Sequence, residues 1–203
     1  MGKSTLAVNL ACALVSRRDR VVLVDADDQA TASLWAQEGR LPLPVVAHPV
    51  ESEEAAEELI HRLARLREEV PLVVVDLPPH LGFATAAALA VADLLVTPVT
   101  PSGADLQATG RALALLEEAR QARQDGRPAC LLVPSRVDRR TGPGREIVAV
   151  LQEFGLPVAP AVGQRTAQVD AYTTGQWIGD YAPGSAAHRE IKALAAAVRR
   201  ALA

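Results

Sequence analysis

Aromatic residues and cysteines are scarce in this sequence. Phe, Trp and Tyr together make up 3% of its 203 residues, and there are 2 cysteines. Because hydrophobic residues still reach 49%, we expect a core built from Ala, Val and Leu. Two cysteines are too few for a disulfide-rich scaffold. Cys12 and Cys130 lie in apolar runs, so we expect buried, reduced thiols.

Long hydrophobic runs and excess positive charge are also missing. No apolar segment approaches the ~18 residues that a membrane-spanning helix needs, and no signal peptide is recognisable. The formal net charge is -3 and the pI is about 5.8, which excludes a globally basic nucleic-acid binder but allows a local basic patch. We therefore expect a cytoplasmic protein with one domain over residues 1–203.

Short β-branched runs alternate with longer amphipathic runs along the chain. This order is typical of an α/β fold with a doubly wound, mostly parallel sheet and helices on both faces. The predicted strands are Val21–Asp25, Pro44–Ala47, Leu72–Asp76, Asp93–Pro98, Cys130–Pro134 and Val158–Val162. The predicted helices include Ser52–Glu69, Ala104–Arg123, Arg145–Phe154 and a last one near Ala186–Leu202. In such folds ligands bind at the carboxyl ends of the strands.

The chain opens with Gly2-Lys3-Ser4-Thr5, which matches the second half of the phosphate-binding pattern G-x-x-x-x-G-K-[S/T]. In that loop backbone N–H groups cradle phosphates, the lysine reaches the β- and γ-phosphates, and the hydroxyl binds Mg²⁺. A helical pattern begins at once, so the motif lies at a helix N-terminus. Of the 21 Lys+Arg only Lys3 and Lys192 are lysines, and one of them falls on the motif position. The alternative is an ordinary helix start.

Two of the apolar strands end in an aspartate. Asp25 is followed by Ala26-Asp27-Asp28-Gln29, and Asp76 is followed by Leu77-Pro78-Pro79. A carboxylate that closes an apolar strand is typical of a Walker B motif, where it holds Mg²⁺ directly or through water. Each aspartate alone could equally cap a helix or a turn. Both together, after Gly2-Lys3-Ser4-Thr5, favour a nucleotide site.

These segments resemble the motifs of ParA/MinD-type ATPases, which have the P-loop NTPase fold. Gly2-Lys3-Ser4-Thr5, Asp25-x-Asp27-x-Gln29 and Asp76-Leu77-Pro78-Pro79 are similar to the Walker A, Walker A′ and Walker B motifs. The run from Ala92 to Ser102 and the segment Gly163-Gln164-Arg165 extend the resemblance over nearly the whole chain. It is nearest to the short ParA proteins that partition plasmids and to relatives that position cellular cargo.

The resemblance implies a role for each motif residue. Lys3 would neutralise phosphate charge, Thr5 would contact the α-phosphate, and Asp27 would orient the attacking water. The implied catalytic residues are Lys3 and Asp27, and the implied metal residues are Ser4, Asp25 and Asp76. The implied nucleotide-binding residues are Gly2, Lys3, Ser4, Thr5, Pro134 and Arg136, the last two near the base.

The implied activity is ATP hydrolysis to ADP and phosphate with Mg²⁺, weak unless a partner and DNA stimulate it. ATP would join two subunits into a homodimer, which would bind DNA nonspecifically on the nucleoid. A ParB-like protein on the cargo would trigger hydrolysis and release. Four basic residues of the last helix are candidates for the DNA surface, or for a solvated helix face: Arg189, Lys192, Arg199 and Arg200. The cargo stays open between plasmid, chromosome, chemoreceptor cluster and enzyme microcompartment.

Three alternatives remain at this point. Membrane positioning of the MinD kind needs bulky apolar residues on one face of the last helix, whereas this helix is rich in alanine and is expected to pack on its own domain, so we expect no membrane binding. An ATP-dependent metabolic ligase of the same superfamily would need a small acid for turnover. A non-hydrolysing remnant is the third alternative.

The remnant alternative follows from a departure from the family pattern K-G-G-x-G-K-[S/T]. Met1 occupies the x position, and the preceding glycines, the signature lysine and the first strand have no counterpart in the sequence. We expect the native chain to extend upstream by on the order of ten residues, which would complete the loop. The intact mass of the protein from its own cells tests this expectation.

Overall fold

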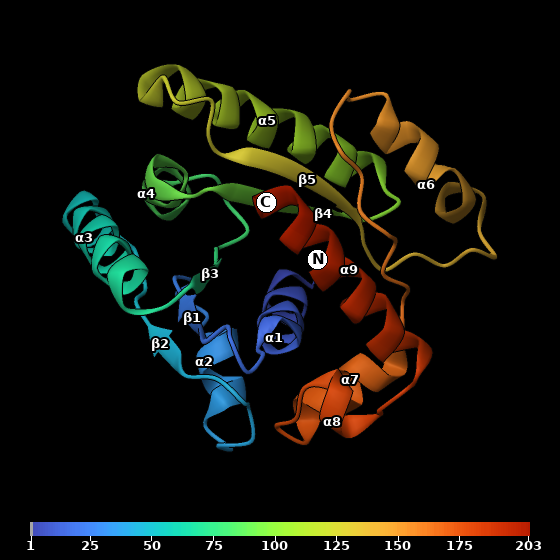
Figure 1. Cartoon of the computed structure of the whole chain (residues 1–203). Coiled ribbons are helices and arrows are strands. Elements are labelled where there is room, and N and C mark those ends of the chain that lie inside the picture. Colours follow the sequence, from blue (N-terminus) through green and yellow to red (C-terminus); the bar gives the residue numbers. More distant parts are fainter. Residues whose placement is uncertain (1) are drawn as a thin grey trace.

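Helices and strands alternate up to β5 in the computed structural model, which describes residues 2–203, and four helices follow one another after β5 (Figure 1). The parallel strands are β1 (Val21–Asp25), β2 (Val45–Ala47), β3 (Leu72–Asp76), β4 (Leu94–Val99) and β5 (Ala129–Pro134). The helices are α1 (Lys3–Leu14), α2 (Thr31–Ala36), α3 (Glu53–Glu69), α4 (Phe83–Val91), α5 (Gly103–Arg123), α6 (Gly142–Gln152), α7 (Thr166–Thr173), α8 (Ile178–Tyr181) and α9 (Ala186–Leu202). The predicted α/β class with parallel strands is confirmed.

The strands form two parallel sheets in the part of the chain that the structure describes. One has the order β2-β1-β3 and the other pairs β4 with β5. The register of β1 and β3 places Asp25 opposite Asp76. One edge of β3 and one edge of β4 therefore have no strand partner among residues 2–203, and both strands are only half-buried over most of their length.

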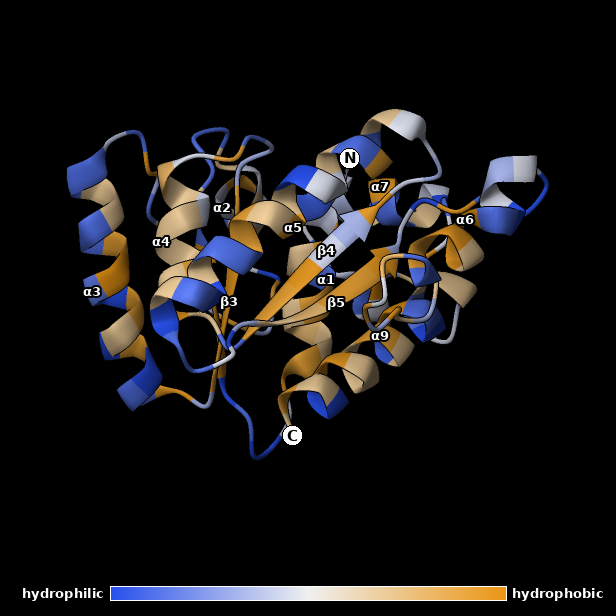
Figure 2. Ribbon diagram, turned by 90° about the horizontal axis from the view of Figure 1, so that it is seen from above, coloured by the Kyte–Doolittle hydropathy of each residue, from blue (hydrophilic) through white to orange (hydrophobic). Residues whose placement is uncertain are grey.

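Alternating side chains of the strands build the core. Val21 and Leu23 of β1 face α1 and α9, whereas Val22 and Val24 face α3 and α4. On the second sheet, Leu131 and Val133 of β5 join the same layer as α1 and α9, whereas Cys130 and Leu132 face α5 and α6. Helices therefore cover both faces, as the sequence predicted. Helices α1 and α9 bridge the two sheets (Figures 1 and 2).

Most predicted elements lie within three residues of the observed ones. The exception is Val158–Val162, which forms no regular strand and contributes only a bridge from Val158 to Leu132. Pro157, directly before this segment, and Pro160 within it explain this, because proline lacks the N–H that a ladder needs. Cys12 and Cys130 are buried, unpaired thiols, and burial raises the pKa of Cys12 to about 12. No helix within residues 2–203 is long and apolar enough to cross a membrane.

Candidate functional site

The N-terminus of α1 is open to an anion. Gly2 precedes the helix with φ +75°, a left-handed conformation that glycine adopts without strain. No side chain caps the helix there, so the N–H groups of the first turn have no side-chain acceptor. The helix dipole adds partial positive charge at the same point. The local structure is therefore suited to bind phosphate, as the motif predicts.

Asp76 carries a buried carboxylate without a full set of partners. The residue is 2% exposed, and its Oδ2 has no hydrogen-bond partner. The pKa of Asp76 is raised to about 6, mainly by burial; the charges of Asp25 and Asp27 contribute to the increase, and the Ser4 hydroxyl and the Lys3 ammonium oppose it. An unpartnered buried carboxylate oxygen beside a serine hydroxyl fits a Mg²⁺ ion, which prefers a few protein oxygens together with water and phosphate.

Asp25 has a different environment from Asp76, although it ends the neighbouring strand. Its Oδ2 accepts hydrogen bonds from Ser33 N (2.8 Å) and Ser33 Oγ (2.8 Å), and its Oδ1 accepts one from Asp27 N (3.3 Å). These bonds tie the end of β1 to the first turn of α2. Asp25 thus fixes the loop that carries Asp27.

Lys3 and Asp27 complete a group of charges around the α1 N-terminus. Burial lowers the pKa of Lys3, while Asp76, Asp27 and Asp105 oppose this shift. Burial also raises the pKa of Asp27, with Gln29 N donating to its Oδ1 at 3.1 Å. The structure therefore brings together the predicted residues Lys3, Asp27 and Asp76. The structure also places Asp105 near Lys3, which the sequence did not predict. Its position after the predicted strand Asp93–Pro98 was the one feature of the sequence that could have indicated it.

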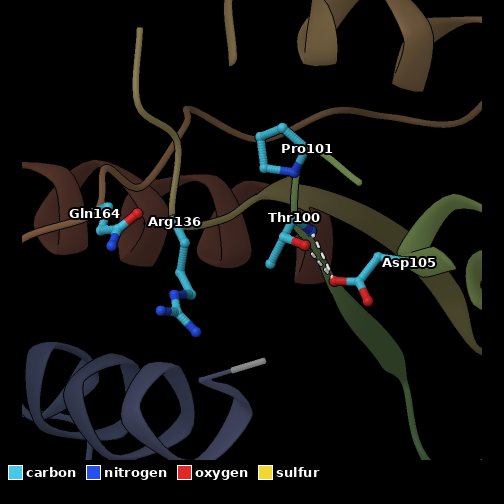
Figure 3. A pocket seen from close by; sticks show the side chains of 5 residues that line it. All are labelled: Thr100, Pro101, Asp105, Arg136 and Gln164. Carbon is cyan, nitrogen blue, oxygen red and sulfur yellow. Dashed lines mark hydrogen bonds between the residues drawn. The ribbon is translucent and has the colours of Figure 1, made fainter. Parts of the chain in front are cut away.

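Two cavities lie beside this group. The larger, of about 480 Å³, extends from Gly2 and Thr5 to Ser135, Arg136 and residues of α7. The smaller, of about 310 Å³, has Thr100, Pro101 and Asp105 on one side and Arg136 and Gln164 on the other (Figure 3). Thr100 N donates to Asp105 Oδ2 at 3.2 Å, and its hydroxyl donates to the same oxygen. Arg136 and Gln164 line both cavities.

The two residues expected near a base are placed differently. Arg136 lines both cavities and has φ +52°, a strained left-handed conformation for a residue with a side chain. Pro134 is buried at the end of β5 and is not among the cavity residues, and its carbonyl accepts a hydrogen bond from Val162 N (2.8 Å). Pro134 therefore supports the wall of the cavity, whereas Ser135 and Arg136 form it.

Helix α7 forms the far wall of the larger cavity, which the sequence did not predict. Gln168, Val169 and Tyr172 line the cavity from this helix, and Val169 is 66% exposed. Tyr172 packs edge-on against Trp35, with the ring centroids 5.1 Å apart. Trp35 Nε1 also donates to Gln176 O at 3.1 Å. This wall of the cavity is therefore partly apolar and partly polar.

The four basic candidates of α9 lie on one exposed stripe of the helix: Arg189, Lys192, Arg199 and Arg200. Two of them already have structural partners. Arg199 donates to Asp19 Oδ2 (2.6 Å) and to Leu14 O (2.6 Å), and Arg189 donates to Gly184 O. The apolar face of α9, with Ile191, Leu194 and Val198, is buried in the core. The prediction that this helix packs on its own domain is confirmed.

No cluster of three His, Cys, Asp or Glu side chains converges on a metal-sized site anywhere in residues 2–203. A metal here would therefore need the Ser4 hydroxyl, a single buried carboxylate and oxygens from a bound phosphate. That ligand set is typical of Mg²⁺ bound together with a nucleotide.

A family profile described as the CobQ/CobB/MinD/ParA nucleotide binding domain matches residues 1–178. The chain belongs to the CobQ/CobB/MinD/ParA family. A carboxysome distribution protein A ("Maintenance of carboxysome distribution protein A") of Gloeobacter kilaueensis is 38% identical over 166 residues, covering 79% of this chain and 70% of that protein. The chromosome-partitioning ATPase Soj of Thermus thermophilus is 32% identical over 212 residues, covering 91% of this chain and 85% of that protein.

The fold of this family member is also that of a solved relative. The septum site-determining protein MinD of Pyrococcus horikoshii, complexed with Mg-ADP, superposes with a TM-score of 0.78 at 19% identity, covering 97% of this chain and 90% of that one. The predicted resemblance to ParA/MinD-type ATPases is therefore confirmed. Its relatives include positioning and partition ATPases, and that is the coarse class of this protein.

Proposed function

We propose that this chain is an ATP-binding and ATP-hydrolysing switch that positions a large cargo. The observation that carries the proposal is the meeting of Lys3 and Ser4 at an uncapped helix N-terminus with the unpartnered Oδ2 of Asp76. The triphosphate would lie on the first turn of α1, and the nucleoside would occupy the 480 Å³ cavity beside it. The Mg-ADP complex of MinD supports the choice of ligand.

Each residue of the group has a role in the proposed reaction. Ser4 and Asp76 would hold Mg²⁺, which supplies positive charge to the phosphate oxygens. Lys3 would neutralise the β- and γ-phosphates, and its proximity to Asp27 and Asp76 helps keep it protonated. Asp27, held by Asp25 and Gln29, would orient the water that attacks the γ-phosphorus, releasing ADP and phosphate. Phosphoryl transfer depends mainly on such positioning and charge stabilisation.

The finer part of the proposal concerns partners. Leu81 and Phe83, 46% and 52% exposed, form apolar surface in the segment that follows Asp76 in the chain. Such surface suits an ATP-dependent second subunit or a ParB-like stimulating protein. The basic stripe of α9 would bind DNA nonspecifically. Carboxysome distribution and chromosome partitioning are functions of the similar proteins and indicate the kind of cargo.

Titration with a fluorescent ATP analogue tests the nucleotide site, and the two lysines of the chain form a matched pair. We expect Lys3→Gln to weaken binding by about tenfold or more, because it removes a cation from the phosphates, and Lys192→Gln to bind like the unmodified chain. EDTA should weaken binding to the unmodified chain. Equal affinity of Lys3→Gln and the unmodified chain would contradict the proposal.

A further inference from the structure

Glu190 on α9 contacts residues of the wall of the larger cavity but does not line the cavity itself. Its Oε2 accepts a hydrogen bond from Gly163 N at 3.0 Å, and its Oε1 accepts one from the guanidinium of Arg165 at 2.6 Å. Gln164 and Arg165 are themselves lining residues of that cavity. A single carboxylate on the C-terminal helix thus holds both ends of a three-residue stretch of the wall. Glu190 is the only acidic residue of α9.

The segment that Glu190 holds also determines where its neighbours lie. Gln164 N donates to Val137 O (3.2 Å) and Val137 N donates to Val162 O (3.1 Å), which joins the segment to the loop that carries Arg136. Arg165 directly precedes α7, so its backbone sets the start of the helix that brings Gln168 and Tyr172 to the cavity. Displacing residues 163–165 would therefore move both the loop that carries Arg136 and the start of α7, which form two walls of the cavity.

The conformation of Arg165 depends on Gly163. The guanidinium folds back over Gly163, where a Cβ would lie only 2.9 Å from Arg165 Nε. Arg165 makes no side-chain cap to α7, so its charge is directed to Glu190 and not to its own helix. The partly buried carboxylate of Glu190 accepts two charge-assisted hydrogen bonds, one from Arg165 and one from Gly163 N, which gives a defined geometry as well as stabilisation.

We infer that Glu190 is a positioning residue for the nucleotide cavity: by holding Gly163 and Arg165 it fixes the wall formed by residues 163–165 and the start of α7. The inference rests on the proposed function for the identity of the ligand. It assigns to α9 a part in nucleotide binding, in addition to its packing in the core and its basic stripe. Glu190 acts through Arg165 and does not itself line either cavity.

The test uses the full chain and the variants Glu190→Gln, Arg165→Gln and the double variant. Glutamine keeps an acceptor for Gly163 N and removes the charge, so the fold should survive. We expect each single variant to bind a fluorescent ATP analogue with Mg²⁺ about fivefold more weakly. The double variant should be no weaker than either single variant, because both changes break the same interaction. Glu118→Gln, an exposed change on α5, is the matched control and should bind normally.

Hydrogen exchange without nucleotide gives a readout that does not depend on the proposed function. Glu190→Gln should speed exchange of the amides from Gly163 to Tyr172 and leave those of α5 unchanged. If the unmodified chain binds no analogue but this exchange rises, the proposed function fails and Glu190 still positions the wall. Unchanged exchange overturns the inference, as does a lower unfolding temperature with unchanged analogue affinity, which would show a purely structural ion pair.

Discussion

Asp25 and Asp76 are register partners at the ends of the paired parallel strands β1 and β3, yet their carboxylates have opposite surroundings. Asp25 accepts three hydrogen bonds from Ser33 and Asp27, whereas Oδ2 of Asp76 accepts none. A carboxylate whose oxygens accept hydrogen bonds stabilises the local structure, whereas a buried carboxylate oxygen without a hydrogen-bond donor is available to bind a cation. Under the proposed function, Asp25 would support the loop and Asp76 would help to bind the ligand.

Replacing Asp76 with Asn should stabilise the ligand-free protein at high pH. The pKa of Asp76 is raised from 3.8 to about 6, so the folded state disfavours the ionised carboxylate. The contribution of Asp76 to the free energy of unfolding is fully present below about pH 4. It decreases as the pH rises from about 4 to about 6, and it is lost above that pH. This change in the pKa of Asp76 corresponds to about 3 kcal/mol. We therefore expect Asp76→Asn to increase the free energy of unfolding by about 3 kcal/mol at pH 8.

Urea denaturation of the unmodified chain and Asp76→Asn at pH 4 and pH 8 measures this effect. The difference between the two proteins should nearly vanish at pH 4. Asp170→Asn, an exposed change on α7, is the control and should show little difference at either pH. If Asp76→Asn and the unmodified chain differed in unfolding free energy by the same amount at both pH values, the raised pKa of Asp76 would be contradicted. The same Asp76→Asn change should lose the Mg²⁺ dependence of nucleotide binding.

Replacing Ser33 with Ala should destabilise the loop that Asp25 holds. The change removes the 2.8 Å hydroxyl donor to Asp25 Oδ2 and leaves the backbone donor in place. Losing a hydrogen bond to a charged group should lower the free energy of unfolding by about 2 kcal/mol at pH 7. Thr173→Ala, which removes an exposed hydroxyl bonded to Val169 O, should cost less than about 0.5 kcal/mol. Similar losses from both variants would count against a special role for Asp25.

Much of the fold and part of the site follow from local sequence signals. Hydrophobic runs ending in Asp25 and Asp76 specify both the strands and the point where the site forms, because parallel strands end at the same edge. The wall formed by α7 could not be predicted in this way, since Gln168, Val169 and Tyr172 carry no motif and reach the cavity only through tertiary packing. The same holds for Glu190, whose partners lie 25 and 27 residues away in the chain.

Replacing Gly144 with Ala should destabilise the protein, whereas the same change at Gly142 should be tolerated. A Cβ at Gly144 would lie 2.0 Å from Asp138 O, a backbone atom that cannot move aside without breaking the turn before α6. We expect a loss of about 3 kcal/mol, in the upper range of overpacking costs. At Gly142 the nearest atom is Arg145 Nη2 at 4.0 Å. Thermal unfolding of the two variants compares them directly, and equal melting temperatures would show that the turn rearranges.

Replacing Arg199 or Arg200 with Gln should separate the structural and the electrostatic parts of the basic stripe. Arg199 ties α9 to Asp19 and to the end of α1, so Arg199→Gln should lower the free energy of unfolding by about 1 kcal/mol. Arg200 is exposed and has no hydrogen bond or ion pair within residues 2–203, so Arg200→Gln should leave stability unchanged.

If the stripe binds DNA, Arg200→Gln should reduce the salt dependence of that binding by about one unit of slope, because one fewer counterion is displaced. Fluorescence anisotropy with duplex DNA at several salt concentrations measures the slope. A slope unchanged by Arg200→Gln and by Lys192→Gln would place the DNA surface elsewhere on the protein.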